Sequence, residues 1–278
     1  MKINFPLSHG IELQISSETN QGAGYPTARI QKGLVLLCDG QSLVEEAVGF
    51  GVPILKRGLQ TIFPGQMELF PHEGLSSSQV SARYNMNLVE KIARSDGDTI
   101  NNRQVYAGKN IMAALIRSLP FMRGLLTRTS SLLRSALGWE TTYEPIDFFT
   151  HVTLTYTIDA VAGRILVELI GQEYIPDSIS EIIVMNEQGA HHFDQYQDSD
   201  GISEIGNKIG CWDQVTAASA SFSSSGLQLA FSLPQENGAR LFRGREMIGK
   251  RLAWSGFGYS FPPSLNHFSH EITIKRLL

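Results

Sequence analysis

The stretch HVTLTYTID, residues 151–159, has the strictest alternation of apolar and polar side chains in the sequence. Successive side chains of a β-strand point to opposite faces. Val152, Leu154, Tyr156 and Ile158 are therefore expected to face a core, while the three threonines face the wetter side. β-branched and aromatic residues also favour strands. The stretch predicts a strand that is buried on one face.

Similar patterns recur on both sides of this stretch, separated by turn signals. Gly and Pro occur every few residues in 42–74, which favours short strands and tight turns over helices. Asn237-Gly238 predicts a hairpin between the two strand-like runs that flank it. The further candidate strands, with Tyr84, Val167 and Leu229 among their buried residues, are 78–92, 164–171, 226–233 and 270–276.

Residues 110–138 differ from the rest because their apolar side chains recur at helical spacing. Asn110 is a suitable N-cap and Gly138 a suitable residue just past the C-terminus. Pro120 is expected to kink the helix or to begin a second one. We therefore predict one amphipathic helical segment at 110–138, with arginines on its polar side.

No strand–helix–strand alternation, the mark of a parallel sheet, accompanies this helix. The sequence thus predicts a mainly β protein, a large antiparallel β-sandwich with the helical segment 110–138 inserted. We expect a single domain over residues 1–278. The alternative is two β domains, 1–98 and 140–278, joined by the helix.

Charge is distributed unevenly along the chain. The net charge of −4 argues against general nucleic-acid binding. Residues 99–139 contain six basic and no acidic residues, so the remainder carries −10, from 17 basic and 27 acidic residues. The candidate partners of the basic segment 110–138 are an anionic surface and a second copy of the chain.

The sequence carries no signal for export or membrane insertion. Its first residues lack the uninterrupted apolar core of a signal peptide, and no apolar run reaches the roughly 18 residues needed to cross a membrane. Two cysteines, Cys38 and Cys211, are too few for a disulfide framework, and Cys38 is expected to be a small buried hydrophobe. We expect a soluble, cytoplasmic protein.

Common catalytic motifs are missing, among them GxSxG, the P-loop, HExxH, CxxC and GxGxxG. Whether the protein is an enzyme stays open. The adjacent His191 and His192 would point apart on a strand. Scattered histidines are therefore favoured over a metal site.

Aromatic residues suggest a saccharide, because flat rings stack on the C–H faces of sugars. Trp139, Trp212 and Trp254, with Tyr143, Tyr259 and Phe261, are the candidate platforms. Glycines around Trp254 and Tyr259 suggest a turn there. That turn would meet a second one at 49–53. The alternative is ordinary core packing, the commoner use of tryptophan.

A carboxylate and an imidazole beside such a platform could perform acid–base catalysis. Glu45 or Glu73 is the candidate carboxylate, and His72 or His267 is the candidate imidazole. In the alternative, these polar groups are scattered in water. The function predicted by analogy with large β-sandwiches is saccharide binding or processing. The competing hypothesis is a non-enzymatic module for surface association or oligomerisation through 110–138.

The acidic stretch between residues 194 and 204 resembles a calcium loop in part, because oxygen ligands recur before a glycine. The match is poor, since Tyr196 and Asn207 stand where acidic ligands are expected. A solvated acidic turn is the favoured interpretation, and no other cofactor is predicted. The candidate calcium ligands are Asp194, Asp198, Asp200 and Glu204.

Overall fold

The computed structural model describes residues 1–7, 10–19, 26–72, 78–94, 139–148, 150–170, 175–248, 252–265 and 267–277. These residues form β-strands and two short 3₁₀ turns, η1 (Pro26–Arg29) and η3 (Gly206–Lys208), without an α-helix. The helical segment predicted at 110–138 lies outside the described residues. The prediction of a mainly β protein with large antiparallel sheets is confirmed.

A small antiparallel sheet is built from the first four strands. These are β1 (Lys2–Pro6), β2 (Ile11–Ser16), β3 (Val35–Cys38) and β4 (Gln41–Ser42), hydrogen-bonded in the order β1-β2-β3-β4. A bridge between Leu34 and Phe50 joins this part of the chain to the second sheet.

The second sheet has 15 strands, and the described strands in it pair antiparallel. Their order is β13-β12-β15-β16-β19-β10-β9-β7-β6-β5-β11-β18-β17-β14, with β8 paired to β7. The strands are β5 (Gly49–Arg57), β6 (Gln60–Pro71), β7 (Gln79–Arg94), β8 (Trp139–Pro145), β9 (His151–Asp159), β10 (Arg164–Ile170), β11 (Glu181–Gln188), β12 (Gln195–Asp198), β13 (Ser203–Ile205), β14 (Asp213–Gln214), β15 (Ser219–Ser224), β16 (Leu229–Pro234), β17 (Arg240–Ile248), β18 (Leu252–Phe261) and β19 (His267–Arg276).

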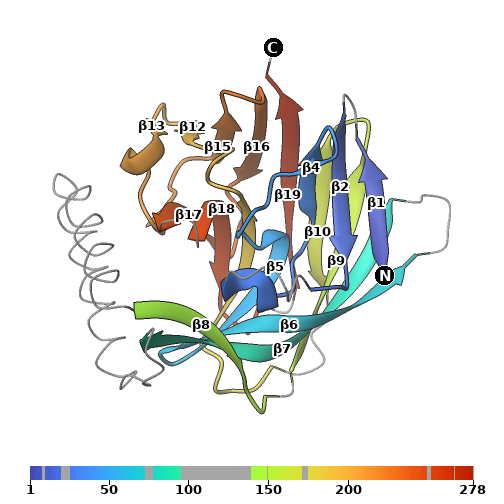
Figure 1. Cartoon of the computed structure of the whole chain (residues 1–278), viewed down its shortest axis with the longest axis vertical. Helices are drawn as coiled ribbons and strands as arrows, with labels where there is room; N and C mark the ends of the chain where they lie inside the picture. Colours follow the sequence, from blue (N-terminus) through green and yellow to red (C-terminus); the bar gives the residue numbers. More distant parts are fainter. Residues whose placement is uncertain are drawn as a thin grey trace.

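The large sheet does not lie in one plane. In Figure 1, β6, β7 and β8 cross the lower part of the molecule, while β9, β10 and β19 stand upright. The strands from before residue 95 form one block in it, β7-β6-β5, between strands from after residue 138, since β5 pairs with β11 and β7 with β9. The same hydrogen-bonded sheet therefore contains strands from both ends of the chain.

The main core lies between the small sheet and the inner face of the large one. It unites Leu13 and Ile15 of β2 with Phe50 of β5 and Tyr156 of β9. Burying one such side chain contributes about 1.5–3 kcal/mol. The residues predicted to be buried are confirmed, each at most 1% exposed: Tyr84, Leu154, Tyr156, Val167 and Leu229.

Strands β5 and β11 are buried on both faces. A second apolar cluster lies on the other side of the sheet and includes Val52 and Ile54 of β5, Ile183 and Met185 of β11 and Tyr143 of β8. Strands covered on both faces have nearly continuous apolar sequences, as in IIVM of β11. This second face carries the candidate site.

Three predictions made from glycines are wrong. Residues 49–53, the second expected turn, form the start of β5. Gly238 does lie in a turn, with φ of 82°, but β16 pairs with β15 and β19 whereas β17 pairs with β14 and β18. The turn therefore joins two strands that are far apart in the hydrogen-bonded order of the sheet, and it makes no hairpin. Residues 254–259 are not a turn but the middle of β18, where glycine serves close packing.

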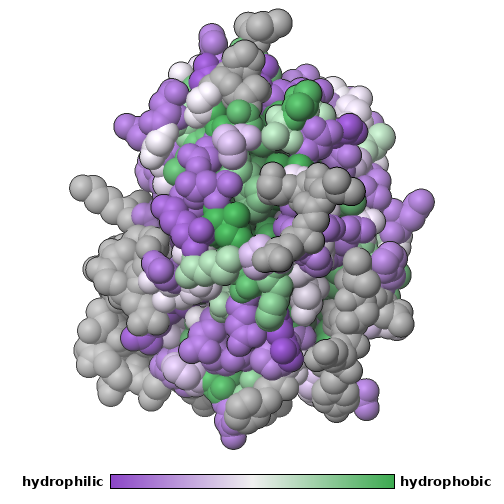
Figure 2. Space-filling view, turned by 90° about the vertical axis from the view of Figure 1, so that its right-hand side faces the viewer, coloured by the Kyte–Doolittle hydropathy of each residue, from purple (hydrophilic) through white to green (hydrophobic). Residues whose placement is uncertain are grey.

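The surface is mainly hydrophilic on the side that Figure 2 faces, where hydrophilic residues surround a narrow band of apolar ones. Neither Cys38 nor Cys211 is in a disulfide. Cys38 is buried, as predicted, and Cys211 is exposed. Within the described residues, no helix is long and apolar enough to span a membrane.

Candidate functional site

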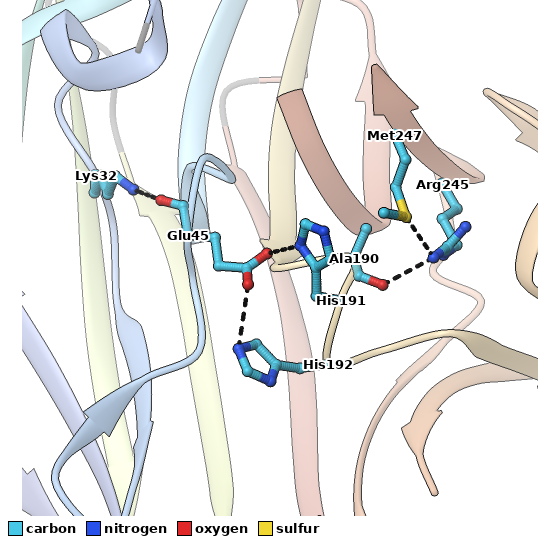
Figure 3. Close-up of polar contacts among 7 residues, drawn as sticks. All are labelled: Lys32, Glu45, Ala190, His191, His192, Arg245 and Met247. Carbon is cyan, nitrogen blue, oxygen red and sulfur yellow. Dashed lines mark hydrogen bonds and ion pairs between the residues drawn. The ribbon is translucent and has the colours of Figure 1, made fainter. Parts of the chain in front are cut away.

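Glu45 lies between two histidines, which we call, with it, the carboxylate–imidazole cluster (Figure 3). His191 Nδ1 lies 2.7 Å from Glu45 Oε2, and His192 Nε2 lies 3.4 Å from Oε1. The three side chains are 26%, 48% and 30% exposed for Glu45, His191 and His192. When each ring donates its N–H to the carboxylate, Nε2 of His191 and Nδ1 of His192 are left to exchange protons with a bound molecule.

Two turns bring these residues together across 146 positions of sequence. Glu45 has a left-handed backbone, with φ of 45°, in the turn before β5. The histidines follow β11, in a turn where His192 N donates to Gly189 O at 3.1 Å. Gly189 N donates to Leu43 O at 2.7 Å, and a Cβ at Gly189 would lie 2.7 Å from Glu45 Oε2. Only glycine lets the two turns approach this closely.

Lys32 and Glu187 lie behind the cluster. Lys32 Nζ donates to the main-chain oxygen of Glu45 at 2.5 Å. Burial lowers the pKa of Lys32 to about 8, although the charges of Glu46, Glu187 and Glu45 oppose this shift. Burial raises the pKa of Glu187 to about 8. The hydrogen bond that Val48 N donates to Glu187 Oε2 at 3.4 Å acts in the opposite direction and lowers this pKa. At neutral pH the buried carboxyl is therefore mostly protonated.

An aromatic shelf, formed by Trp212, Phe242 and Trp254, lies on the same face of the sheet. The rings of Trp212 and Phe242 are parallel, with centroids 5.6 Å apart, and Trp254 meets Trp212 edge-on at 6.5 Å. All three residues are half-buried. Trp254 Nε1 donates to Glu246 Oε2 at 3.3 Å, which places a carboxylate at the edge of the shelf.

Glycines in β17 and β18 make room for these rings. A Cβ at Gly258 would lie 2.4 Å from the Trp212 ring, and one at Gly244 would lie 2.6 Å from the Trp254 ring. Gly256 lies between Glu187 and Gly244 in the strand register, so the Glu187 side chain shares this face. Gly258, one of the glycines that predicted a turn, thus forms with Gly244 the floor of an aromatic surface.

The histidine turn is hydrogen-bonded to β17 and β18, the strands that carry Phe242 and Trp254. Ala190 N donates to Ala253 O at 3.4 Å, and Arg245 Nη2 donates to Ala190 O at 3.0 Å (Figure 3). Ala253 and Arg245 directly precede Trp254 and Glu246 in sequence. The histidine turn is therefore fixed to the two strands that carry the shelf.

The structure separates the other predicted site residues. His72 Nε2 bonds Ser81 Oγ at 2.8 Å at the far end of β6, and His267 is exposed at the start of β19. The imidazoles that contact Glu45 are those of His191 and His192 instead, and Glu73 lies outside the described residues. Tyr259 is fully buried, with its ring 4.6 Å from that of His270, so it offers no exposed face to a sugar.

The acidic stretch folds as a turn between β12 and β13. Asp198 Oδ1 accepts the N–H groups of Asp200 and Ile202 at 3.1 and 3.0 Å, and Glu204 pairs with Arg243 at 2.8 Å. Burial lowers the pKa of Arg245, and the negative charge of Asp194 opposes this shift. Within the described part of the chain, no group of three or more His, Cys, Asp or Glu is placed to hold a metal ion. These contacts suit the solvated turn.

Several site residues were not predicted. His191 and His192 were set aside because adjacent side chains diverge on a strand, whereas they lie in a turn. Phe242 carried no local signal, because its role depends on the pairing of β17 with β18. The adjacency of two histidines to a Gly, just past a strand, was the only available signal.

Comparison with solved structures finds this fold in alpha-N-acetylgalactosaminidase NagBb from Bifidobacterium bifidum. Its GalNAc complex matches with a TM-score of 0.51 at 12% identity, over 99% of this chain and 36% of the NagBb chain. The Gal-NHAc-DNJ complex matches over the same shares with a TM-score of 0.50 at 12% identity. The chain thus spans about a third of NagBb. No family model and no curated protein matches it. At this identity the likeness establishes the fold alone.

Proposed function

We propose that the protein binds a saccharide on the aromatic shelf. The observation that carries the proposal is the set of half-buried rings of Trp212, Phe242 and Trp254 laid over glycines, with Glu246 at their edge. Parallel rings present a flat apolar face that suits the C–H face of a sugar, and a carboxylate accepts hydrogen bonds from its hydroxyls. The saccharide-bound NagBb structures support N-acetylgalactosamine as the first probe.

Calorimetric titration with N-acetylgalactosamine tests this proposal. Trp212→Ala and Trp254→Ala are expected to weaken binding about tenfold each, as loss of roughly 1.4 kcal/mol of ring contact predicts. Gly258→Ala should also weaken binding, because the added methyl displaces the Trp212 ring. Gly226→Ala is the matched control, since nothing lies within 4 Å of its Cβ position. Equal affinities in all four variants would refute the shelf as the site.

A fluorophore on the exposed Cys211 gives an independent reading. The only other cysteine, Cys38, is buried, so labelling is selective for the residue next to Trp212. A saccharide that binds the shelf should change the emission of this label. A titration that changes calorimetric heat without changing the label would place the ligand elsewhere.

We propose, as a second candidate, that the carboxylate–imidazole cluster processes the bound saccharide. It is favoured by the hydrogen bonds that fix the histidine turn to Ala253 and Arg245 beside the shelf. An imidazole oriented by Glu45 can take a proton from a hydroxyl or water and return it to a leaving oxygen, typically worth 10²–10⁴-fold in rate. Release of the aryl group from an aryl α-N-acetylgalactosaminide, compared with Glu45→Gln, tests this. Turnover that is unchanged by Glu45→Gln would assign catalysis elsewhere, and binding without turnover leaves the binding function alone.

The domain organisation and the second hypothesis for 110–138 also stay proposals. One domain over residues 1–278 is supported by the sheet that unites both halves of the chain. Surface association or oligomerisation through 110–138 concerns residues outside those described.

A further inference from the structure

A polar recess lies where the end of β2 faces the outer side of β6 and β7. It has a volume of about 520 Å³, within the range of small-molecule sites. Nine of its 11 lining residues carry polar or charged side chains, since only Gly65 and Met67 do not. A recess with this lining suits a ligand rich in hydrogen-bonding groups.

The strand register explains why these side chains converge. Gln66 of β6 lies opposite Asn85 of β7, which lies opposite His151 of β9. Directly opposed residues point to the same face of a sheet. Glu68 and Arg83 form the next row on that face. The register of β6 shifts on either side of Pro64, and such bulges often lie next to binding sites.

Gln31 holds the opposite wall in place. Its side-chain Nε2 donates to Ser16 O at 2.6 Å, and its main-chain N donates to Pro64 O at 2.8 Å. The buried amide therefore links the end of β2 to β6. Ser17, Glu18 and Thr19 follow the last residue of β2, Ser16, and line the recess on this side. The recess is thus built from both sheets with a fixed wall.

We propose that this recess binds an uncharged, hydroxyl-rich ligand, a monosaccharide or polyol, independently of the aromatic shelf. Asn85 and Gln66 both donate and accept hydrogen bonds, as each sugar hydroxyl does. Glu18 and Glu68 can accept hydrogen bonds from hydroxyls and disfavour an anionic ligand, while Arg83, opposite Glu68, keeps the net charge small. An apolar ligand would displace water from these groups without replacing its hydrogen bonds, which disfavours it.

Titration of the Trp212→Ala variant, in which binding at the shelf is weakened, with D-galactose and N-acetylgalactosamine tests the recess. Saturation-transfer NMR and calorimetry should detect binding that Asn85→Leu weakens about tenfold, because hydrogen bonds are lost while the number of side-chain heavy atoms stays the same. Gln66→Leu, at an exposed position, should act in the same direction and does not threaten folding. Ser269→Ala, exposed on the same sheet face outside the recess, is the control and should bind normally.

The outcomes separate the two sites. Absence of binding in Trp212→Ala would overturn the recess while leaving the shelf intact. So would Asn85→Leu and Gln66→Leu variants that bind as tightly as the protein without these substitutions. Tighter binding of glucuronate than of the uncharged sugars would overturn the proposed ligand class. Binding that is lost only with the recess variants would instead overturn the shelf.

Discussion

Replacing Glu187 by Gln should make the protein lose more stability on acidification than the wild type does. Its pKa is raised to about 8 by burial, from an ordinary value of 4.5. Between these values the folded chain holds a proton that the unfolded chain releases, so the Glu187 contribution to stability grows as pH falls. From pH 6.5 to pH 5 this gain amounts to about 2 kcal/mol, at 1.36 kcal/mol per pH unit.

His270 opposes this gain from the other face of the sheet. Its Nε2 lies 3.2 Å from Asn186 Oδ1, its Nδ1 has no partner, and burial lowers its pKa from 6.5 to about 3. Below pH 6.5 the unfolded chain therefore takes up a proton that the folded chain does not. Stability is lost as pH falls towards 3, again by about 2 kcal/mol between pH 6.5 and 5. The two contributions nearly cancel in the wild type.

Urea denaturation at pH 6.5 and pH 5 measures this balance. Relative to the wild type, Glu187→Gln should lose about 2 kcal/mol more on acidification, and His270→Gln should lose about 2 kcal/mol less. The double variant should change its free energy of unfolding between the two pH values by about as much as the wild type does. This result would show that the effects of the single variants come from the two titrating groups and not from substitution in general. Lys32, with a pKa of about 8, stays charged over this interval. If both single variants run parallel to the wild type, neither group has the ionisation state inferred from its burial.

Four further outcomes are expected. Tyr156→Phe should lower the free energy of unfolding by about 2–4 kcal/mol, because Tyr156 Oη donates to Gly51 O and also bonds Tyr84 Oη. This loss should exceed that of Tyr84→Phe, and equal losses in urea denaturation would contradict the reasoning. Gly189→Ala should displace Glu45 and lower stability by roughly 1–3 kcal/mol, whereas Gly226→Ala should not. Adding a chelator should leave the melting temperature unchanged, and a decrease would revive calcium binding at Asp198 and Asp200. If residues 110–138 associate with anionic lipid, the protein should sediment with such vesicles at low but not high salt; no sedimentation at low salt would exclude that role.

The strands were predictable because their signal is local. Alternation in 151–159 and 78–92 identified the buried faces of β9 and β7 without knowledge of their partners. Pairing across a sheet, however, is not encoded locally. Asn237-Gly238 correctly indicated a turn, yet the sequence could not show that its two flanking strands join different neighbours.

The site was harder to predict because its parts come from distant positions. Glu45 was identified, but its histidine partners depend on the close approach of two turns, which in turn depends on Gly189. Tyr259 and Trp254 carried the same aromatic signal and have opposite fates. Their side chains alternate on β18, so Tyr259 enters the main core and Trp254 faces the shelf.

The glycines of the shelf also distinguish a fold requirement from a site requirement. Gly256 serves the fold, because a Cβ there would lie 2.2 Å from the main-chain oxygen of Asn186. Gly244 and Gly258 mainly accommodate the tryptophan side chains. A glycine within a strand costs about 0.5–1 kcal/mol relative to alanine. If these residues only packed the sheet, small apolar side chains in place of the glycines, with fewer rings above them, would cover it with a smaller loss of stability. Large rings that contact the glycine positions and are left half-exposed are better explained by a ligand that completes their burial.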